Sequence, residues 1–249
     1  MIFEELGLVE WVYIISTIAI LPAIIFGLVA QLKVSFAFNK YSQVQVSSGK
    51  TAAQLAEEML RENAVDCKVE LGHGHLTDHY DPRTKSVVLS PEVYHGNSVA
   101  AYGIAAHEVG HAIQDATNYA PLRIRHAVVK GTSAINKLLL PIIVIGMIAQ
   151  IFWLFDSEIL IYFIGALVIF YFLTFLISVI TLPTEYNASN RAKEMLRQTN
   201  AMDENQQRGV RKVLSAAALT YLAGLVVSLV YFLRFASFLL ILASKSRRR

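Results

Sequence analysis

Four stretches of the chain contain no Asp, Glu, Lys or Arg and consist mostly of apolar residues. They are between 18 and 26 residues long, and about 20 apolar residues are enough for a helix to cross the hydrocarbon core of a bilayer. The pattern therefore predicts a mainly α-helical, polytopic membrane protein with about four transmembrane helices. The four stretches are residues 11–32, 138–155, 159–184 and 213–233.

The composition agrees with a membrane protein and excludes several other classes. Hydrophobic residues make up 55% of the 249 positions and charged residues only 16%, whereas soluble domains carry about 25% charged residues. Cys67 is the single cysteine, so the chain has no internal disulfide, which fits a reducing compartment. The same numbers exclude a disordered, a collagen-like and a disulfide-stabilised protein.

The distribution of basic residues predicts how the helices are oriented. Of the 22 Lys and Arg residues, 11 lie in residues 33–137, six in 185–212 and five in 234–249. The first ten residues and the connection at 156–158 contain none. Because basic residues beside membrane helices stay in the cytosol, we expect 33–137 and 185–212 to be cytosolic. The N-terminus and 156–158 then lie outside, and residues 138–184 form a tight transmembrane hairpin.

The C-terminal part allows two interpretations. The fourth apolar run ends at Arg234, and apolar residues then continue to Ser244, so that the hydrophobic segment covers 213–244. Ten residues of helix rise only about 15 Å, so either one long tilted helix buries Arg234 or the last part is re-entrant or interfacial. The basic tail, 245–249, favours the second interpretation, and we expect it to bind anionic lipid. No pattern in the chain indicates a nucleic-acid partner.

Residues 33–137 predict a small α+β module, because helical and strand patterns alternate there within a polar background. Turn residues that include a proline separate two of the strands and predict a hairpin. The expected elements are a helix at 51–63, a strand at 67–71, strands at 76–80 and 86–90, and a helix at 98–118.

The sharpest motif lies in the last of these helices and reads His107-Glu108-Val109-Gly110-His111. Residues four apart project from one face of a helix, so both imidazoles can reach one zinc ion. Glu108 directly follows the first histidine and can act as general base on a water that zinc activates. The motif therefore predicts Zn²⁺ as cofactor, His107 and His111 as its ligands and Glu108 as the catalytic residue.

A catalytic zinc site needs a third protein ligand. The longer form of the motif, with a third histidine six residues after the second, is absent. Glu185 is the first charged residue after the third predicted membrane helix, and an even number of crossings returns it to the side of the histidines. It begins a predicted cytosolic helix, 185–212. Glu194, Asp115 and His126 are weaker alternatives.

Four segments together resemble the YugP-type neutral zinc metallopeptidases, a bacterial membrane-bound family. The resemblance extends over nearly the whole chain. It implies His107, His111 and Glu185 as zinc ligands and Glu108 as catalytic base. Together with the distribution of basic residues, it leads us to expect a zincin-like catalytic module at the cytosolic face of the bacterial cytoplasmic membrane. The segments are 76–82, 86–90, 105–114 and 182–189.

Three further side chains and one strand are candidates for supporting roles. Asp115 lies four residues after His111 and can either orient its imidazole or be an exposed carboxylate. Arg191 can pair with the third ligand, stabilise a tetrahedral oxyanion or be a surface residue. Asn187 stands where the resembling family usually has aspartate, which puts a supporting role for it in doubt. The strand at 86–90 can either accept an extended substrate at a sheet edge or be covered.

These observations favour a membrane-embedded zinc metalloendopeptidase that hydrolyses protein or peptide substrates at the cytosolic membrane face. One alternative is a membrane-anchored binding or scaffold protein with an inactive zinc site. Another is a zinc hydrolase that acts on an amide other than a peptide. Cleavage of an unfolded protein substrate distinguishes the first alternative from the peptidase.

Overall fold

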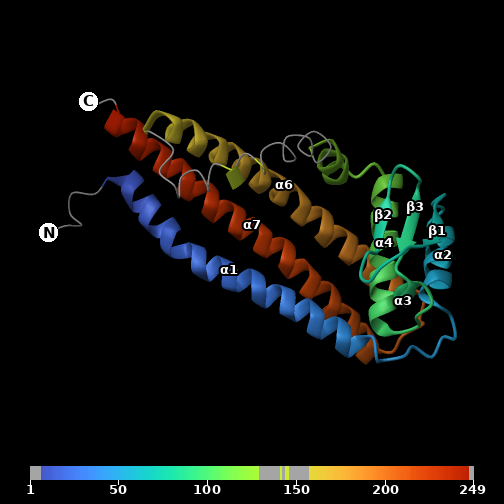
Figure 1. Ribbon diagram of the computed structural model, residues 1–249. Helices are drawn as coiled ribbons and strands as arrows, with labels where there is room; N and C mark the ends of the chain where they lie inside the picture. The colour runs from blue at the N-terminus through green and yellow to red at the C-terminus, as the bar shows by residue number, and fades with distance from the viewer. Residues whose placement is uncertain (1–6, 129–140, 142–143, 146–156, 247–249) are drawn as a thin grey trace. The chain divides into compact units, whose positions relative to one another are not determined.

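The computed structural model describes residues 7–128, 141, 144–145 and 157–246, and they form two compact units. Three helices in this part of the chain are long and apolar enough to cross a membrane (Figure 1). Apart from three positions, the predicted membrane helix at 138–155 lies outside the described residues, as do 156 and 247–249. The three long helices are α1 (Leu8–Tyr41), α6 (Ser157–Gln198) and α7 (Glu204–Ser246).

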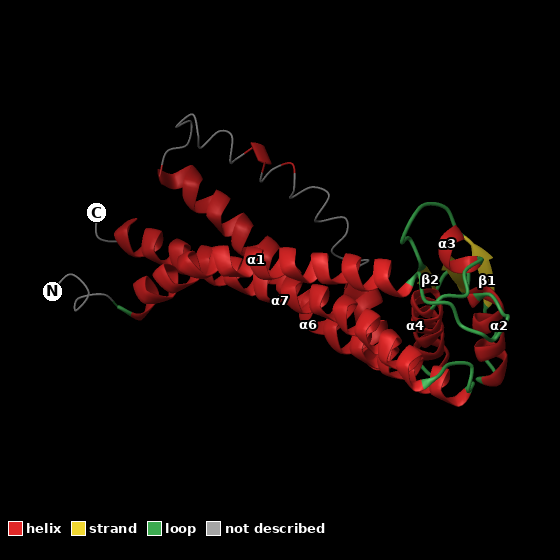
Figure 2. Cartoon of the chain, turned by 90° about the horizontal axis from the view of Figure 1, so that it is seen from below, coloured by secondary structure: helices red, strands yellow, loops and turns green. Residues whose placement is uncertain are grey.

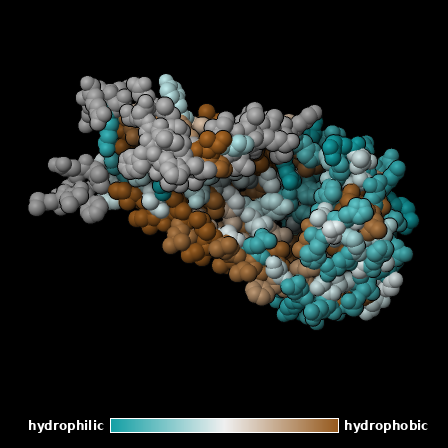
Figure 3. Space-filling model, viewed as in Figure 1, coloured by the Kyte–Doolittle hydropathy of each residue, from teal (hydrophilic) through white to brown (hydrophobic). Residues whose placement is uncertain are grey.

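The described residues of unit 1 are 7–28, 125–128, 141, 144–145, 157–180 and 221–246. Within it, Ile164 of α6 is buried and packs in one cluster with Phe235 of α7. Many large apolar side chains of these helices are exposed, among them several leucines and isoleucines of α1. In Figure 3 the visible, ungreyed part of this surface is largely brown. A helix that is hydrophobic all round needs an apolar environment, so unit 1 has the surface of a membrane protein.

Helix α7 continues through Arg234 without interruption. Segment 213–244 is therefore part of one continuous helix, as the first of the two interpretations requires. The Arg234 guanidinium lies over the rings of Tyr13 and Phe235, 5.7 and 5.9 Å from their centroids. Such cation–π contacts favour a cation in an apolar setting, which explains why the helix tolerates this charge.

Unit 2 comprises residues 29–124 and 181–220 and holds the predicted α+β module. Its short elements follow the sequence pattern closely (Figure 2). Helix α2 begins with a capping box in which Thr51 and Gln54 bond each other's backbone, and its apolar face is buried. The elements are α2 (Ala52–Glu62), β1 (Lys68–Leu71), β2 (His79–Asp81), β3 (Ser86–Leu89), α3 (Pro91–Tyr94) and α4 (Val99–Ala116).

The three strands form one sheet in the order β1-β3-β2. Strands β2 and β3 are antiparallel, as the predicted hairpin requires, and β1 pairs with β3 in parallel. The Asp78 carboxylate joins the hairpin to the following turn, because it accepts hydrogen bonds from the backbone N–H and the hydroxyl of Ser90. Since β3 is the central strand, the idea that residues 86–90 form an open edge is wrong. Strand β2 is an edge strand instead.

Helix α4 and the segment of α6 that follows residue 181 approach each other closely. A Cβ atom at Gly110 would lie 2.7 Å from the carbonyl oxygen of Ala188, which is closer than real Cβ atoms come to backbone oxygen. The neighbouring residues Ala106 and Ala192 are also small and fully buried. A glycine at position 110 therefore lets the two helix backbones come into contact.

We expect Gly110→Ala to destabilise unit 2 by about 1–3 kcal/mol, the usual cost of overpacking a well-packed core. Thermal unfolding in detergent measures the effect. Gly103→Ala on the same helix is the matched control, because its Cβ would meet Val210 at an ordinary 3.4 Å. Equal stability of the two variants would contradict the assigned contact.

Candidate metal centre

Helix α4 presents both histidines of the motif on one face. Its N-cap is Ser98, whose hydroxyl accepts a hydrogen bond from the N–H of Ala101. The rings of His107 and His111 are edge-to-face with centroids 4.8 Å apart. His111 is buried, and Glu108 between them is 9% exposed. The helix therefore brings two imidazoles and one carboxylate to the same place.

Helix α6 supplies a third ligand group at that place. The Oε2 atom of Glu185 lies 3.2 Å from Nε2 of His107 and 3.5 Å from Nε2 of His111. All three ligand atoms lie within 4.8 Å of one another. A tetrahedral zinc ion with bonds of about 2.0–2.2 Å has ligand atoms separated by about 3.4 Å. The three side chains are thus positioned to bind a metal ion, and their chemistry fits zinc.

The other nitrogen of each imidazole is held by a neutral partner. Nδ1 of His107 lies 3.2 Å from the hydroxyl of Ser189, and Nδ1 of His111 lies 2.9 Å from Oε1 of Gln114. Such partners orient metal ligands. Neither residue was predicted from the sequence. The signal that could have marked them is spacing, because Gln114 lies three residues after His111 and Ser189 four residues after Glu185, so that each shares a helix face with that ligand.

The carboxylates around the histidines favour positive charge there. Burial disfavours the charged form of His111, but Glu185 and Glu108 outweigh burial and raise the pKa of His111. A group of anions that attracts a proton also attracts a metal cation. The site therefore has the electrostatic character of a cation site.

The remaining predicted residues divide into those near the site and those that serve elsewhere. Asp115 does not partner His111, because its carboxylate accepts a 2.8 Å hydrogen bond from the hydroxyl of Tyr80 on β2. Burial and this carboxylate raise the pKa of Tyr80, which keeps its hydroxyl protonated. Arg191 donates through Nε to Oδ1 of Asn187 at 2.9 Å. The same oxygen of Asn187 accepts a 3.0 Å hydrogen bond from Nε2 of Gln114, whose Oε1 lies beside His111.

The alternative third ligands do not join this cluster. Among the described residues, the group of three or more potential ligand side chains consists of His107, His111 and Glu185. Glu194 is exposed at the surface of α6 and pairs with Arg197 at 2.9 Å. The sequence-based preference for Glu185 over Asp115, His126 and Glu194 thus agrees with the geometry.

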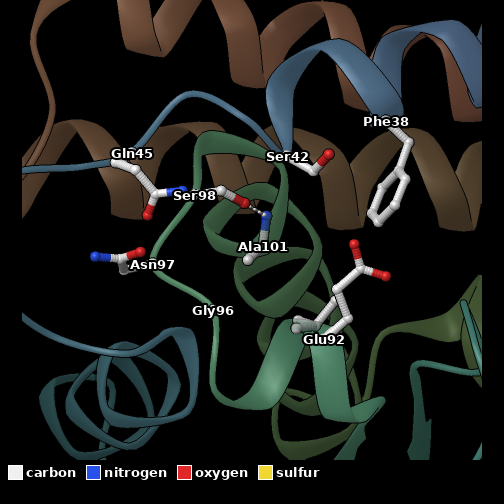
Figure 4. Close-up of a pocket in the computed structure, with 9 residues that line it drawn as sticks. Phe38, Ser42, Gln45, Glu92, Gly96, Asn97, Ser98 and Ala101 are labelled. Carbon is white, nitrogen blue, oxygen red and sulfur yellow. Dashed lines mark hydrogen bonds between the residues drawn. The ribbon is translucent and has the colours of Figure 1, made fainter.

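A separate cavity of about 80 Å³ lies beside the N-terminus of α4 (Figure 4). Its lining includes Phe38 of α1, Glu92 of α3 and the N-cap Ser98. Because Ser98 precedes His107 by nine residues, about 14 Å along the helix, this cavity is not part of the metal centre.

The fold and this centre define a membrane protein with an H-E-x-x-H zinc site, and comparison with known proteins agrees. Residues 16–240 match the family described as "Putative neutral zinc metallopeptidase". The chain is also 43% identical over 210 residues to a Bacillus subtilis protein described as "Putative membrane protease YugP". That match covers 83% of this chain and 88% of the relative. No solved structure matches the chain.

Because the family match covers most of the chain, the protein belongs to this zinc metallopeptidase family. Zinc is accordingly the metal of this family, and His107, His111 and Glu185 are positioned to bind a metal ion.

Replacing Glu185 by alanine should lower zinc affinity by more than the about 10–100-fold typical of losing an outer-shell partner, because a direct ligand is removed. Competition with a chromophoric chelator measures this affinity. Glu194→Ala is the control on the same helix and should bind zinc like the unchanged protein. If the two variants bind zinc equally well, the third ligand is a different residue.

Proposed function

We propose that the protein is a zinc metalloendopeptidase that cleaves protein or peptide substrates at the cytosolic face of the bacterial cytoplasmic membrane. The observation that supports this most strongly is the convergence of His107, His111 and Glu185 from two helices, with Glu108 next to the first ligand. Family membership supports the same chemistry.

In this proposal Glu108 is the general base. When bound, zinc supplies Lewis-acid activation of the attacking water and of the scissile carbonyl group. Glu108 accepts a proton from the water and returns it to the nitrogen of the leaving amine. Its place beside His107 keeps the carboxylate at the metal centre, and its low exposure of 9% limits competition from bulk water.

The oxygen of the attacked carbonyl gains negative charge and needs a donor. Arg191 is the nearest basic residue on α6 after Glu185. Its Nε already donates to Asn187, so we assign the stabilising role to the terminal guanidinium nitrogens. In this arrangement Asn187 positions Arg191. Asn187 thus has a supporting role even though it carries no charge.

Strands β1 and β2 are the two edges of the sheet, and β2 is the edge strand that packs against α4, so we propose it as the place where an extended peptide pairs. Tyr80 in the centre of β2 bonds Asp115, one turn after His111 on the metal-binding helix. A peptide added to this edge would present its backbone beside α4. This arrangement favours a peptide substrate over another type of amide.

The charge pattern supports the proposed topology. With 33–137 and 185–212 in the cytosol and the N-terminus outside, the even number of crossings between His111 and Glu185 brings both ligands to one side. The apolar surface of unit 1 supports contact with lipid, and the basic residues 245–249 support contact with anionic headgroups.

Glu108→Gln should retain zinc and lose peptidase activity, because the ligands remain and the base is removed. Catalytic bases contribute about 10²–10⁴-fold to rates, so the loss should exceed a hundredfold. Zinc content and cleavage of an unfolded protein in detergent are the two measurements. Comparative membrane proteomics of cells with the two forms then identifies substrates. If the unchanged protein binds zinc but cleaves the unfolded substrate no faster than Glu108→Gln, the scaffold alternative is favoured.

Cysteine labelling tests the topology, because a Cys67→Ser background contains no other thiol. Cysteines placed at Glu4 and Ser157 should react with a membrane-impermeant maleimide in intact cells. Cysteines placed at Lys50 and Gln206 should react only after the membrane is opened. External labelling at position 206 would put Glu185 across the membrane from the histidines and would overturn the proposed site.

A further inference from the structure

Gln114 is a fully buried polar residue between α4 and α6. Its Oε1 atom lies 2.9 Å from Nδ1 of His111. Its Nε2 atom lies 2.8 Å from the backbone carbonyl oxygen of Thr184 and 3.0 Å from Oδ1 of Asn187. The oxygen and both N–H groups of this amide are therefore engaged, which is the condition for a buried polar group to be stabilising.

The partners of Gln114 fix the orientation of its amide. A backbone carbonyl can only accept a hydrogen bond, so the NH₂ group of Gln114 must face Thr184. The amide oxygen then has to face His111, and an oxygen can only accept. The Nδ1 atom of His111 must consequently carry a proton. In the neutral imidazole that binds a metal, the lone pair is then on Nε2, the nitrogen on the side of Glu185.

We propose that Gln114 is a positioning residue that holds His111 in the Nδ1–H tautomer and so prepares Nε2 to bind zinc. The inference rests on the proposed function, since it assigns a role within that metal centre. The Nδ1 partner of His107 does not fix a tautomer in this way, because the Ser189 hydroxyl beside it can either donate or accept. One imidazole is thus fixed in its protonation pattern by the backbone of α6, and the other is not.

The neighbouring residues support this arrangement. Arg191 can only donate, and its Nε points to the same Oδ1 atom of Asn187 that accepts from Gln114. The Asn187 amide is therefore also fixed, with its oxygen toward both donors. Asn187 and Thr184 belong to α6, the helix that also carries Glu185. Helix α6 therefore provides the third ligand and, through Gln114, also sets the tautomer of His111.

Two substitutions separate a positioning role from a merely structural one. Gln114→Leu keeps the size but removes the acceptor for His111, so zinc affinity should fall by about 10–100-fold. Gln114→Glu keeps an acceptor toward His111 but turns a carboxylate oxygen toward the Thr184 carbonyl. The zinc affinity of Gln114→Glu should stay within about threefold of that of the unchanged protein, a much smaller change than the loss of an outer-shell partner causes. Its metal-free form should unfold at a lower temperature.

The measurements are zinc affinity by chelator competition, the visible absorption spectrum of the Co²⁺-substituted protein, and thermal unfolding without metal. Tyr80→Phe is the matched control, because it removes a hydrogen bond to α4 one turn beyond His111 and should leave zinc affinity unchanged. A changed Co²⁺ spectrum in Gln114→Leu, with that of Gln114→Glu unchanged, would support the role.

The proposal would be overturned if Gln114→Leu bound zinc as tightly as the unchanged protein. It would also be overturned if both variants lost zinc affinity equally. If Gln114→Leu does not fold, Gln114→Met, which also lacks the amide oxygen that faces His111, takes its place in the same comparison. The outcome is separable from the peptidase function: a natural protein that binds zinc without cleaving refutes the function alone. Unaltered zinc affinity in both Gln114 variants refutes this inference alone.

Discussion

The contact between α4 and residues 181–198 of α6 is the constraint on which the metal centre depends. Gly110 lets the backbone carbonyl of Ala188 come up against α4, and this close approach brings the carboxylate of Glu185 to the two imidazoles. Placing three polar side chains in a buried position is costly unless each has a partner. Gln114 and Ser189 supply those partners from the same two helices.

Much of this arrangement follows from local sequence patterns. The helix that carries His107 and His111, the hairpin of β2 and β3 and the capping box at Thr51 all rest on interactions within a few residues, which a sequence displays directly. The choice of Glu185 needed one more step, a count of membrane crossings. The family resemblance is confirmed, and the zinc expected from the motif agrees with it.

The features that escaped prediction depend on which segments meet in space. The central position of β3 was not predictable, because β1 pairs with it in parallel across an intervening strand. Spacing alone left the role of Asp115 open, and only the fold shows that β2 brings the hydroxyl of Tyr80 to its carboxylate. The rings over which Arg234 lies could not be predicted either, because Tyr13 belongs to α1, far away in the sequence. Each case involves a partner that is distant in the sequence or unmarked by any motif.

The spacing of the site residues on α6 has a mechanical consequence. Glu185 and Ser189 lie four residues apart and meet His107 from one helix face. One residue of an α-helix corresponds to a rotation of about 100° and a rise of about 1.5 Å. A turn of α6 by a single position would therefore withdraw the carboxylate and the hydroxyl together. Occupancy of the metal centre thus reports the rotational register of α6 against α4.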